Sequence, residues 1–112
     1  MSNPLNAMLK QAQELQKKME QLQDELLEKR VEGSAGGGMV TAVVNGKGDM
    51  VDVKIDPETV DPDDVEILED LIVAAVNQAR EKARQLAQEE MSKITGGIMP
   101  QGMGGMKLPG LF

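Results

Sequence analysis

Residues 36–55 read GGGMVTAVVNGKGDMVDVKI, and this stretch decides the fold. Side chains of a strand point alternately to its two faces, and the residues that flank Asn45–Gly48 follow this period of two. Asn and Gly tolerate positive φ, so the tetrapeptide is typical of a hairpin turn. The pattern therefore predicts two antiparallel strands. On the first strand Val40, Ala42 and Val44 share one face, opposite Met39, Thr41 and Val43. On the second strand the side chains expected to point inward are Val51, Val53 and Ile55.

A long amphipathic helix is expected before the hairpin, over residues 3–32, with Asn3 as N-cap and Pro4 at the first helical position. Its apolar residues recur at spacings of 4, 3, 4, 3 and 4, which is the pattern of a heptad seam. The seam fits a helix packed on the sheet and on a partner helix better than an independent coiled coil, because it spans only about three heptads. It consists of Met8, Ala12, Leu15, Met19, Leu22 and Leu26. Gly33 ends the helix, and Arg30–Ala35 could form a short additional strand.

A second long helix is expected after the hairpin, from Asp61 as N-cap to about Ile94. Acidic residues crowd its first turn, where the helix dipole favours negative charge. We expect the first half of this helix to be deeply buried. Its apolar stripe comprises Val65, Leu68, Ile72, Ala75 or Val76, Ala79, Ala83 and Leu86.

The order of these elements predicts one α+β domain over residues 1–97, with two long helices and a sheet of two or three antiparallel strands. Residues 98–112 are rich in Gly and Met and lack periodicity, so we expect a flexible tail. The alternative is that its Met, Leu and Phe side chains bind a partner.

The composition excludes several kinds of function. The 112 residues include no Cys, His, Trp or Tyr, and the one Phe is Phe112. Disulfides, zinc fingers and catalysis by Ser-His-Asp or Cys-His are therefore impossible within one chain. Glycine spacing fits neither a phosphate-binding P-loop nor a dinucleotide loop, and the carboxylates lack calcium-loop spacing. We expect no enzyme activity, no cofactor, no metal and no small-molecule substrate.

The remaining composition concerns location and assembly. No apolar run approaches the ~20 residues that span a bilayer, and the N-terminus lacks the shape of a signal peptide, so we expect a cytoplasmic protein without membrane contact. A core of small aliphatic side chains without aromatics favours burial of further surface between subunits, most simply in a two-fold dimer. The residues expected in the core or the dimer interface are Leu15, Met19, Leu22, Leu26, Val51, Val53, Ile55, Leu68 and Ile72.

Three segments together resemble a known family: GGGMVTAVVNGKG at 36–48, VDVKIDP at 51–57 and LEDLIVAAVN at 68–77. With Glu90-Met91 and Thr95-Gly96-Gly97, they are similar to the bacterial YbaB/EbfC family of nucleoid-associated proteins. The resemblance implies intertwined homodimers of α+β subunits, in which strands from both chains build the central sheet and long helices project like tweezers. It also implies binding of double-stranded DNA, largely without sequence preference, in the nucleoid, with roles in nucleoid organisation and gene expression.

The net charge of −7, from 12 basic and 19 acidic residues, does not favour DNA binding by itself. The acidity is concentrated in residues 61–70, however, and a local positive field can still bind phosphates. The alternative is that these basic residues form an ordinary solvated surface with salt bridges and bind no phosphate. Charge alone selects the candidate DNA contacts, which are Lys10, Lys17, Lys18, Lys29, Arg30, Arg80, Lys82, Arg84 and Lys93.

The leading hypothesis is a dimeric clamp whose projecting helices flank a DNA duplex. A second hypothesis is a protein-interaction module that recruits a DNA repair or replication factor without strong DNA binding of its own. A third is a structural scaffold that dimerises and binds nothing charged.

Overall fold

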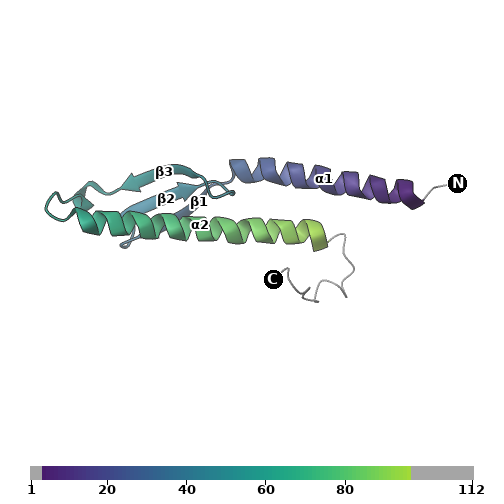
Figure 1. The fold of residues 1–112 in the computed structure, drawn as a ribbon. Coiled ribbons are helices and arrows are strands. Elements are labelled where there is room, and N and C mark those ends of the chain that lie inside the picture. Colours follow the sequence, from purple (N-terminus) through teal and green to yellow (C-terminus); the bar gives the residue numbers. More distant parts are fainter. Residues whose placement is uncertain (1–3, 97–112) are drawn as a thin grey trace.

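The computed structural model describes residues 4–96 and confirms the α+β class, with two long helices and one antiparallel sheet (Figure 1). The elements are α1 Pro4–Glu28, β1 Val31–Ala35, β2 Val40–Val44, β3 Met50–Ile55, the 3-10 helix η1 Pro57–Thr59, and α2 Val65–Gly96. The molecule is elongated and measures 76 × 28 × 19 Å. The predicted tail at 98–112 lies outside the described residues, so the division of the chain at residue 97 stays a prediction.

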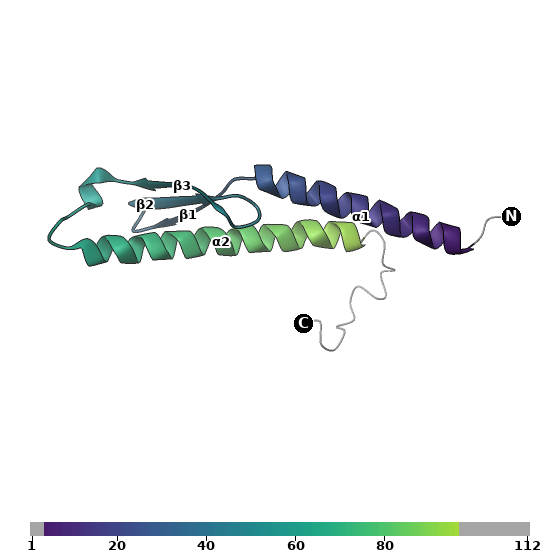
Figure 2. The same cartoon turned by 45° about the horizontal axis from the view of Figure 1, so that its top comes forward.

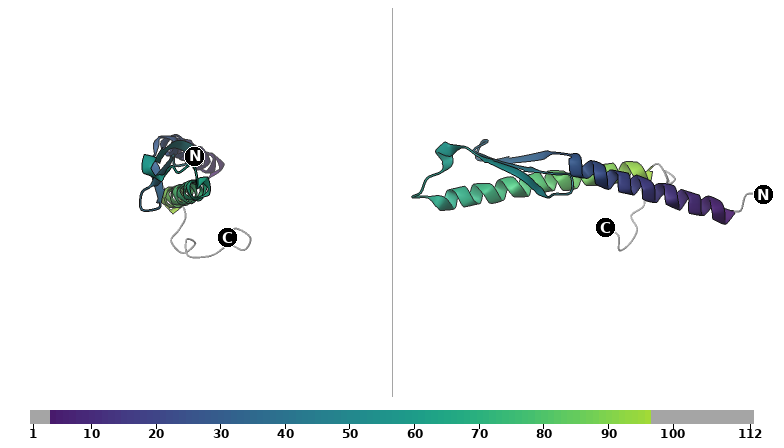
Figure 3. Two further views of the ribbon diagram at one scale, coloured as in Figure 1. Left: turned by 90° about the vertical axis from the view of Figure 1, so that its left-hand side faces the viewer. Right: turned by 90° about the horizontal axis from the view of Figure 1, so that it is seen from above.

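The three strands form one sheet in the order β1-β2-β3, and each neighbouring pair is antiparallel. Helix α2 runs along the sheet and contacts β1 and β2 most extensively, while β3 forms an edge (Figure 2). Helix α1 lies beyond the sheet and packs on the second half of α2 (Figure 3). The predicted hairpin and the additional strand near residues 30–35 are both confirmed.

Small side chains bring the sheet and α2 unusually close together. Buried Val40, Ala42 and Val44 of β2 pack against Ala75, Ala79 and Ala83 of α2. At Gly33 of β1, an added Cβ would lie 2.3 Å from the backbone nitrogen of Ala79. Gly33, predicted to end the first helix, instead lies inside a strand and permits the close approach.

Both helices begin or end several residues from the predicted positions. Helix α1 ends at Glu28 rather than Glu32, because Val31 already pairs with Val44 in the sheet. Helix α2 begins at Val65 rather than after Asp61. Asp61 instead organises a separate turn, since its Oδ1 accepts a hydrogen bond from Asp63 N at 2.9 Å and its carbonyl accepts one from Asp64 N at 3.0 Å.

The burial predicted for β3 and for the first half of α2 is wrong in the single subunit. Val53 pairs with buried Ala42 and so faces α2, but it stays 42% exposed because α2 covers the other two strands. Val51 lies at an irregularity of the ladder, where Met50 pairs with Val44, and is 46% exposed, while Ile55 is only half-buried. In α2, Leu68 and Ile72 are half-buried against the core, whereas Val65, Ile67 and Val73 are at least 50% exposed. A single subunit thus leaves much of its apolar surface uncovered.

The heptad seam of α1 is buried only at its C-terminal end. Leu22 and Leu26 are buried, while Leu15 and Met19 are half-buried. Met8, at the start of the seam, is 66% exposed, because the first half of α1 extends beyond the end of α2 (Figures 1 and 3). The expectation of a helix packed on another helix is therefore met over half of the seam, by α2 of the same chain. The expected packing of this helix on the sheet is wrong, because α1 lies beyond the sheet (Figure 3).

Candidate nucleic-acid interface

The turn between β2 and β3 is organised by the side chain of Asn45. This residue is only 8% exposed, and its Oδ1 accepts hydrogen bonds from Lys47 N at 2.9 Å and Asp49 N at 3.0 Å. Its carbonyl accepts another from Gly48 N at 3.0 Å. Asn and Gly both tolerate positive φ, but among the four turn residues only Gly48 adopts it, at 89°. Asn45 instead acts through its amide, which holds Lys47 at the exposed tip of the turn.

The same turn is held between the two helices. Gly46 N donates a hydrogen bond of 2.7 Å to the carbonyl of Leu26 near the end of α1. A Cβ at Gly46 would lie 2.8 Å from that oxygen, so only glycine permits this approach. On the other side, a Cβ at Gly48 would lie 3.9 Å from Nε of Arg80 on α2. The turn therefore places Lys47 next to a cation from a distant part of the chain.

These elements enclose an open groove of about 560 Å³, which we call the basic groove. Its described lining includes three cationic side chains, from Lys47, Arg80 and Arg84, and no carboxylate. Its lining residues are Gln23, Leu26, Gly46, Lys47, Gly48, Arg80, Arg84 and Ala87. Converging cations of this kind suit an anionic ligand such as a phosphate backbone.

One carboxylate lies next to the groove and moderates its charge. Glu81 accepts hydrogen bonds from Nη2 of Arg84 through both of its oxygens, at 2.8 and 2.6 Å. These hydrogen bonds, and then the negative charge of Glu81, raise the pKa of the Arg84 guanidinium. Arg84 is therefore always charged, and part of its field is cancelled by Glu81.

A second hollow between α1 and α2 has balanced charge. It is smaller, about 180 Å³, and Lys18 of α1 and Lys93 of α2 both line it. Glu25 and Glu90 line it as well, and Lys93 Nζ lies 3.2 Å from Glu90 Oε1. Lys18 and Lys93 were predicted to contact DNA, but this neighbourhood makes them weaker candidates than the groove residues.

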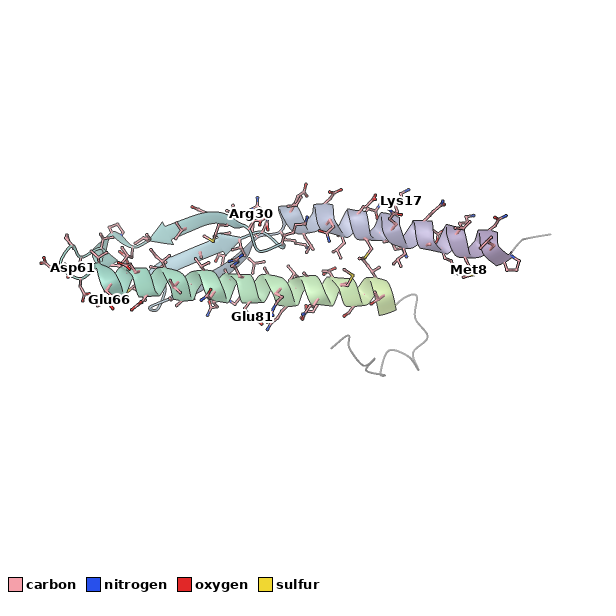
Figure 4. All side chains as sticks on the ribbon, viewed as in Figure 1. Met8, Lys17, Arg30, Asp61, Glu66 and Glu81 are labelled. Atoms are coloured by element: carbon pink, nitrogen blue, oxygen red, sulfur yellow. The ribbon has the colours of Figure 1, made fainter. Side chains whose placement is uncertain are left out.

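The other predicted cations are spread over the molecule. Lys10 and Lys17 lie on α1, and Lys17 is on the part that projects away from the sheet (Figure 4). Lys29 lines a shallow hollow with Glu25 and Glu28. Arg30 donates from Nη1 to the carbonyls of Leu27 and Lys29 at the end of α1, and Lys82 is exposed on α2.

Of the nine predicted cations, the structure thus brings Arg80 and Arg84 together in a groove without a lining carboxylate. It adds Lys47, which is not among the cations predicted from the sequence. The signal was present, because Lys47 is the one residue of the Asn-Gly-Lys-Gly turn with a charged side chain.

A cluster of acidic residues lies at the end of the sheet that is opposite to the basic groove. Residues 56–70 contain eight acidic and no basic residues, whereas the rest of the chain carries 12 basic and 11 acidic residues. Figure 4 shows Asp61 and Glu66 at one extremity of the molecule, with Lys17 toward the other. We call residues 56–70 the acidic end. The net negative charge of the chain is thus concentrated away from the basic groove.

A helix–sheet–helix subunit with a basic groove set apart from an acidic end belongs to the class of small α+β proteins suited to bind nucleic acid. The comparisons with known proteins identify the family. The sequence profile of the YbaB/EbfC DNA-binding family matches residues 1–98, and the chain belongs to this family.

Curated relatives match over almost their whole length. The chain is 55% identical to a nucleoid-associated protein of Acetivibrio thermocellus over 96% of this chain and 89% of the relative. It is 51% identical to the nucleoid-associated protein TTE0040 of Caldanaerobacter subterraneus, over 96% and 90% of the two chains. It is also 51% identical to a nucleoid-associated protein of Syntrophobacter fumaroxidans, over 100% and 98%.

A solved structure shows a similar fold. The crystal structure of the uncharacterized protein HP0035 from Helicobacter pylori aligns with a TM-score of 0.57 and 23% sequence identity, over 79% of this chain and 98% of that one. This similarity supports the fold class. Within residues 4–96, no helix combines the length and apolar character needed to cross a membrane.

Proposed function

We propose that this chain binds double-stranded DNA as a homodimer, largely without sequence preference, and that it acts in the bacterial nucleoid in DNA organisation and gene regulation. The observation that carries the proposal is the basic groove, in which Lys47, Arg80 and Arg84 converge on a chain of a DNA-binding family. In this role the three side chains contact phosphates of the DNA backbone.

The expected lack of sequence preference follows from the chemistry of the groove. Phosphate contacts position a protein on DNA but carry no sequence information. The described residues include no aromatic side chain, since the one Phe is Phe112, so unpaired bases have no platform on which to stack. Duplex DNA is therefore the better ligand.

The exposed apolar surface supports the homodimer. Val51 and Val53 on the sheet edge, and Val65, Ile67 and Val73 on α2, are each 42–58% exposed in one subunit. A symmetric partner that covers this surface would bury it at a gain of about 25 cal/mol per Å². It would also place two basic grooves in one particle, and so double the number of phosphate contacts.

The experiment is a titration of random-sequence duplex DNA followed by fluorescence anisotropy at ~50 mM and ~200 mM salt. Six cations per dimer predict a log-log salt slope of about −5, or roughly a thousandfold loss of affinity between the two salt concentrations. The variant Lys47→Gln should reduce this slope by about 2, because the dimer loses two contacts. Lys54→Gln removes the same charge from exposed β3, outside the groove lining, and serves as the matched control.

Two outcomes would count against the proposal. Equal effects of Lys47→Gln and Lys54→Gln would exclude the basic groove as the DNA site. Absence of binding at ~50 mM salt would exclude strong DNA binding altogether. The alternative would then be an interaction module that recruits a DNA repair or replication protein.

A further inference from the structure

The pair Asn45-Gly46 is the most reactive amide site of the chain on local chemistry alone. In deamidation, the main-chain nitrogen of the residue after an asparagine attacks Cγ of the asparagine side chain. Glycine favours this attack because it has no Cβ to hinder the approach. The chain contains four asparagines, and Asn45 is the one that a glycine follows. The turn at the basic groove therefore carries a chemical group that can modify itself.

The turn also polarises the carbon that would be attacked. Asn45 Oδ1 accepts hydrogen bonds from Lys47 N at 2.9 Å and from Asp49 N at 3.0 Å. Attack on Cγ makes this oxygen negative, and backbone donors at such distances stabilise an oxyanion. Because the electrophile is prepared in this way, access to the attacking nitrogen controls the reaction.

The end of α1 covers the attacking nitrogen. Gly46 N donates a hydrogen bond of 2.7 Å to the carbonyl oxygen of Leu26, and both Asn45 and Gly46 are buried. The three atoms nearest to a Cβ built on Gly46 all belong to Leu26. Hydroxide from the solvent therefore cannot reach the proton of Gly46 N while Leu26 stays in place, and the carbonyl is too weak a base to remove it.

Helix α1 is attached to the rest of the molecule along only part of its length. Leu22 and Leu26 near its C-terminal end are 4% exposed, whereas Met8 near its start is 66% exposed. The helix lies beyond the sheet and adds nothing to its ladder (Figure 3). Elements with few buried apolar contacts open at a lower free energy than the whole fold. Opening of α1 would uncover Gly46 N while the sheet and α2 stay folded.

We propose that Asn45 is a deamidation site that the docked end of α1 keeps closed. When Leu26 leaves the turn, hydroxide removes the proton of Gly46 N, and the nitrogen attacks Asn45 Cγ. The ring closes to a succinimide, and ammonia leaves with a proton taken from water. Water then opens the ring to aspartate, or to isoaspartate, in which the main chain runs through Cγ. In sum, one water is consumed, one ammonium ion is released and one negative charge is added to the chain.

The new carboxylate would lie beside the basic groove. Asn45 Nδ2 lies 3.4 Å from Asp49 Oδ2, so a carboxylate at this position would face another carboxylate. It would also bring a negative charge close to Lys47 and weaken the field of the groove. This loss of affinity for DNA rests on the proposed function, whereas the reaction at Asn45 does not, so the two can fail separately.

The experiment measures the deamidation rate of each asparagine in the full chain by peptide mass spectrometry, at mildly alkaline pH, in buffer and in guanidinium chloride. In denaturant, we expect Asn45 to react faster than Asn6 and Asn77, which Ala7 and Gln78 follow and which serve as internal controls. In the folded chain, Asn45 should react about 100-fold more slowly than in denaturant, which corresponds to an opening free energy of about 2.8 kcal/mol.

Two variants separate the opening of α1 from unfolding of the whole chain. Leu22→Ala leaves a cavity where α1 packs on α2 and should accelerate deamidation of Asn45 in the folded chain by about 30-fold. Leu22→Val is the milder variant if Leu22→Ala does not fold, and it should act in the same direction. Val40→Ala is the matched control, because it leaves its cavity in the core between β2 and α2 and should change the rate by less than about 3-fold.

Several results would overturn the proposal. Equal rates for Asn45 in buffer and in denaturant would show that α1 does not protect the site. Equal acceleration by Leu22→Ala and Val40→Ala would assign the reaction to unfolding of the whole chain, and absence of acceleration in both Leu22 variants would exclude α1 as the cover. A rate for Asn45 in denaturant no higher than that of Asn77 would show that the site is not reactive.

Discussion

Replacement of Gly33 by Ala should destabilise the protein more than its small size suggests. The added Cβ would lie 2.3 Å from Ala79 N, 2.4 Å from the Ala75 carbonyl oxygen and 2.9 Å from Ala79 Cα. All three are backbone atoms of α2, so no side-chain rotation relieves the overlap. To reach an ordinary contact, α2 must move about 1 Å away from β1, and the Ala75–Ala79–Ala83 surface then loses contact with β2. Overpacking of a core typically costs about 1–3 kcal/mol, and we expect the upper end here because the backbone must move.

The assay is urea unfolding followed by circular dichroism at one protein concentration, since a dimer's stability depends on concentration. Gly33→Ala should lower the free energy of unfolding by about 3 kcal/mol without changing the slope against urea. Gly96→Ala is the matched control, because a Cβ there meets nothing within 4 Å and should change stability by at most about 1 kcal/mol. A Gly33→Ala protein within about 0.5 kcal/mol of the native one would refute the close packing of β1 on α2.

Three further predictions concern the turn and the charges. Asn45→Ala removes the acceptor for Lys47 N and Asp49 N, so the free energy of unfolding should fall by about 1–3 kcal/mol, whereas Asn45→Asp keeps an acceptor oxygen and should lose less. Glu81→Gln removes the charge that raises the Arg84 pKa and should tighten DNA binding by about 2- to 5-fold in the anisotropy titration. Glu69→Gln makes the same charge change within the acidic end and is its control. Equal effects of the two would show that only net charge matters. Combined Asp-to-Asn changes at positions 61, 63 and 64 should leave DNA affinity unchanged at ~150 mM salt and tighten it at ~10 mM, where screening is weak. An equal gain at both salt concentrations would contradict a screened acidic end.

The periodic parts of the chain could be predicted from local rules. The period of two around Asn45–Gly48 and the heptad seam of α1 each report a single element, and both elements are present. The orientation of Val53 was also correct, because it follows from strand alternation. Its burial was not, since burial depends on how far α2 extends across the sheet.

The glycines and the groove could not be predicted because they depend on contacts between distant residues. Gly33 and Gly46 read as breakers or turn formers, yet each is needed where another backbone comes too close for a Cβ. Lys47 and Arg80 are 33 positions apart, and only the packing of the hairpin between the helices brings them into one groove. Charge counting along the sequence treated Lys18 and Arg84 alike, although one lies among carboxylates and the other lines the basic groove.

The net charge of this chain does not predict whether the basic groove binds an anion, because acidic and basic residues lie on separate parts of one helix, α2. Asp70, the last residue of the acidic end, and Arg80 of the groove are ten residues apart on α2, or about 15 Å along the axis. The Debye length at physiological salt is about 8 Å, so the carboxylates are strongly screened at the groove. A phosphate at the groove is therefore exposed mainly to Lys47, Arg80 and the part of Arg84 that Glu81 leaves uncompensated. The acidic end still repels DNA that approaches it directly, so it limits which face of the molecule a duplex can occupy. On this argument, the separation of charge along α2 makes an acidic protein compatible with a DNA backbone, and it also directs where the backbone lies.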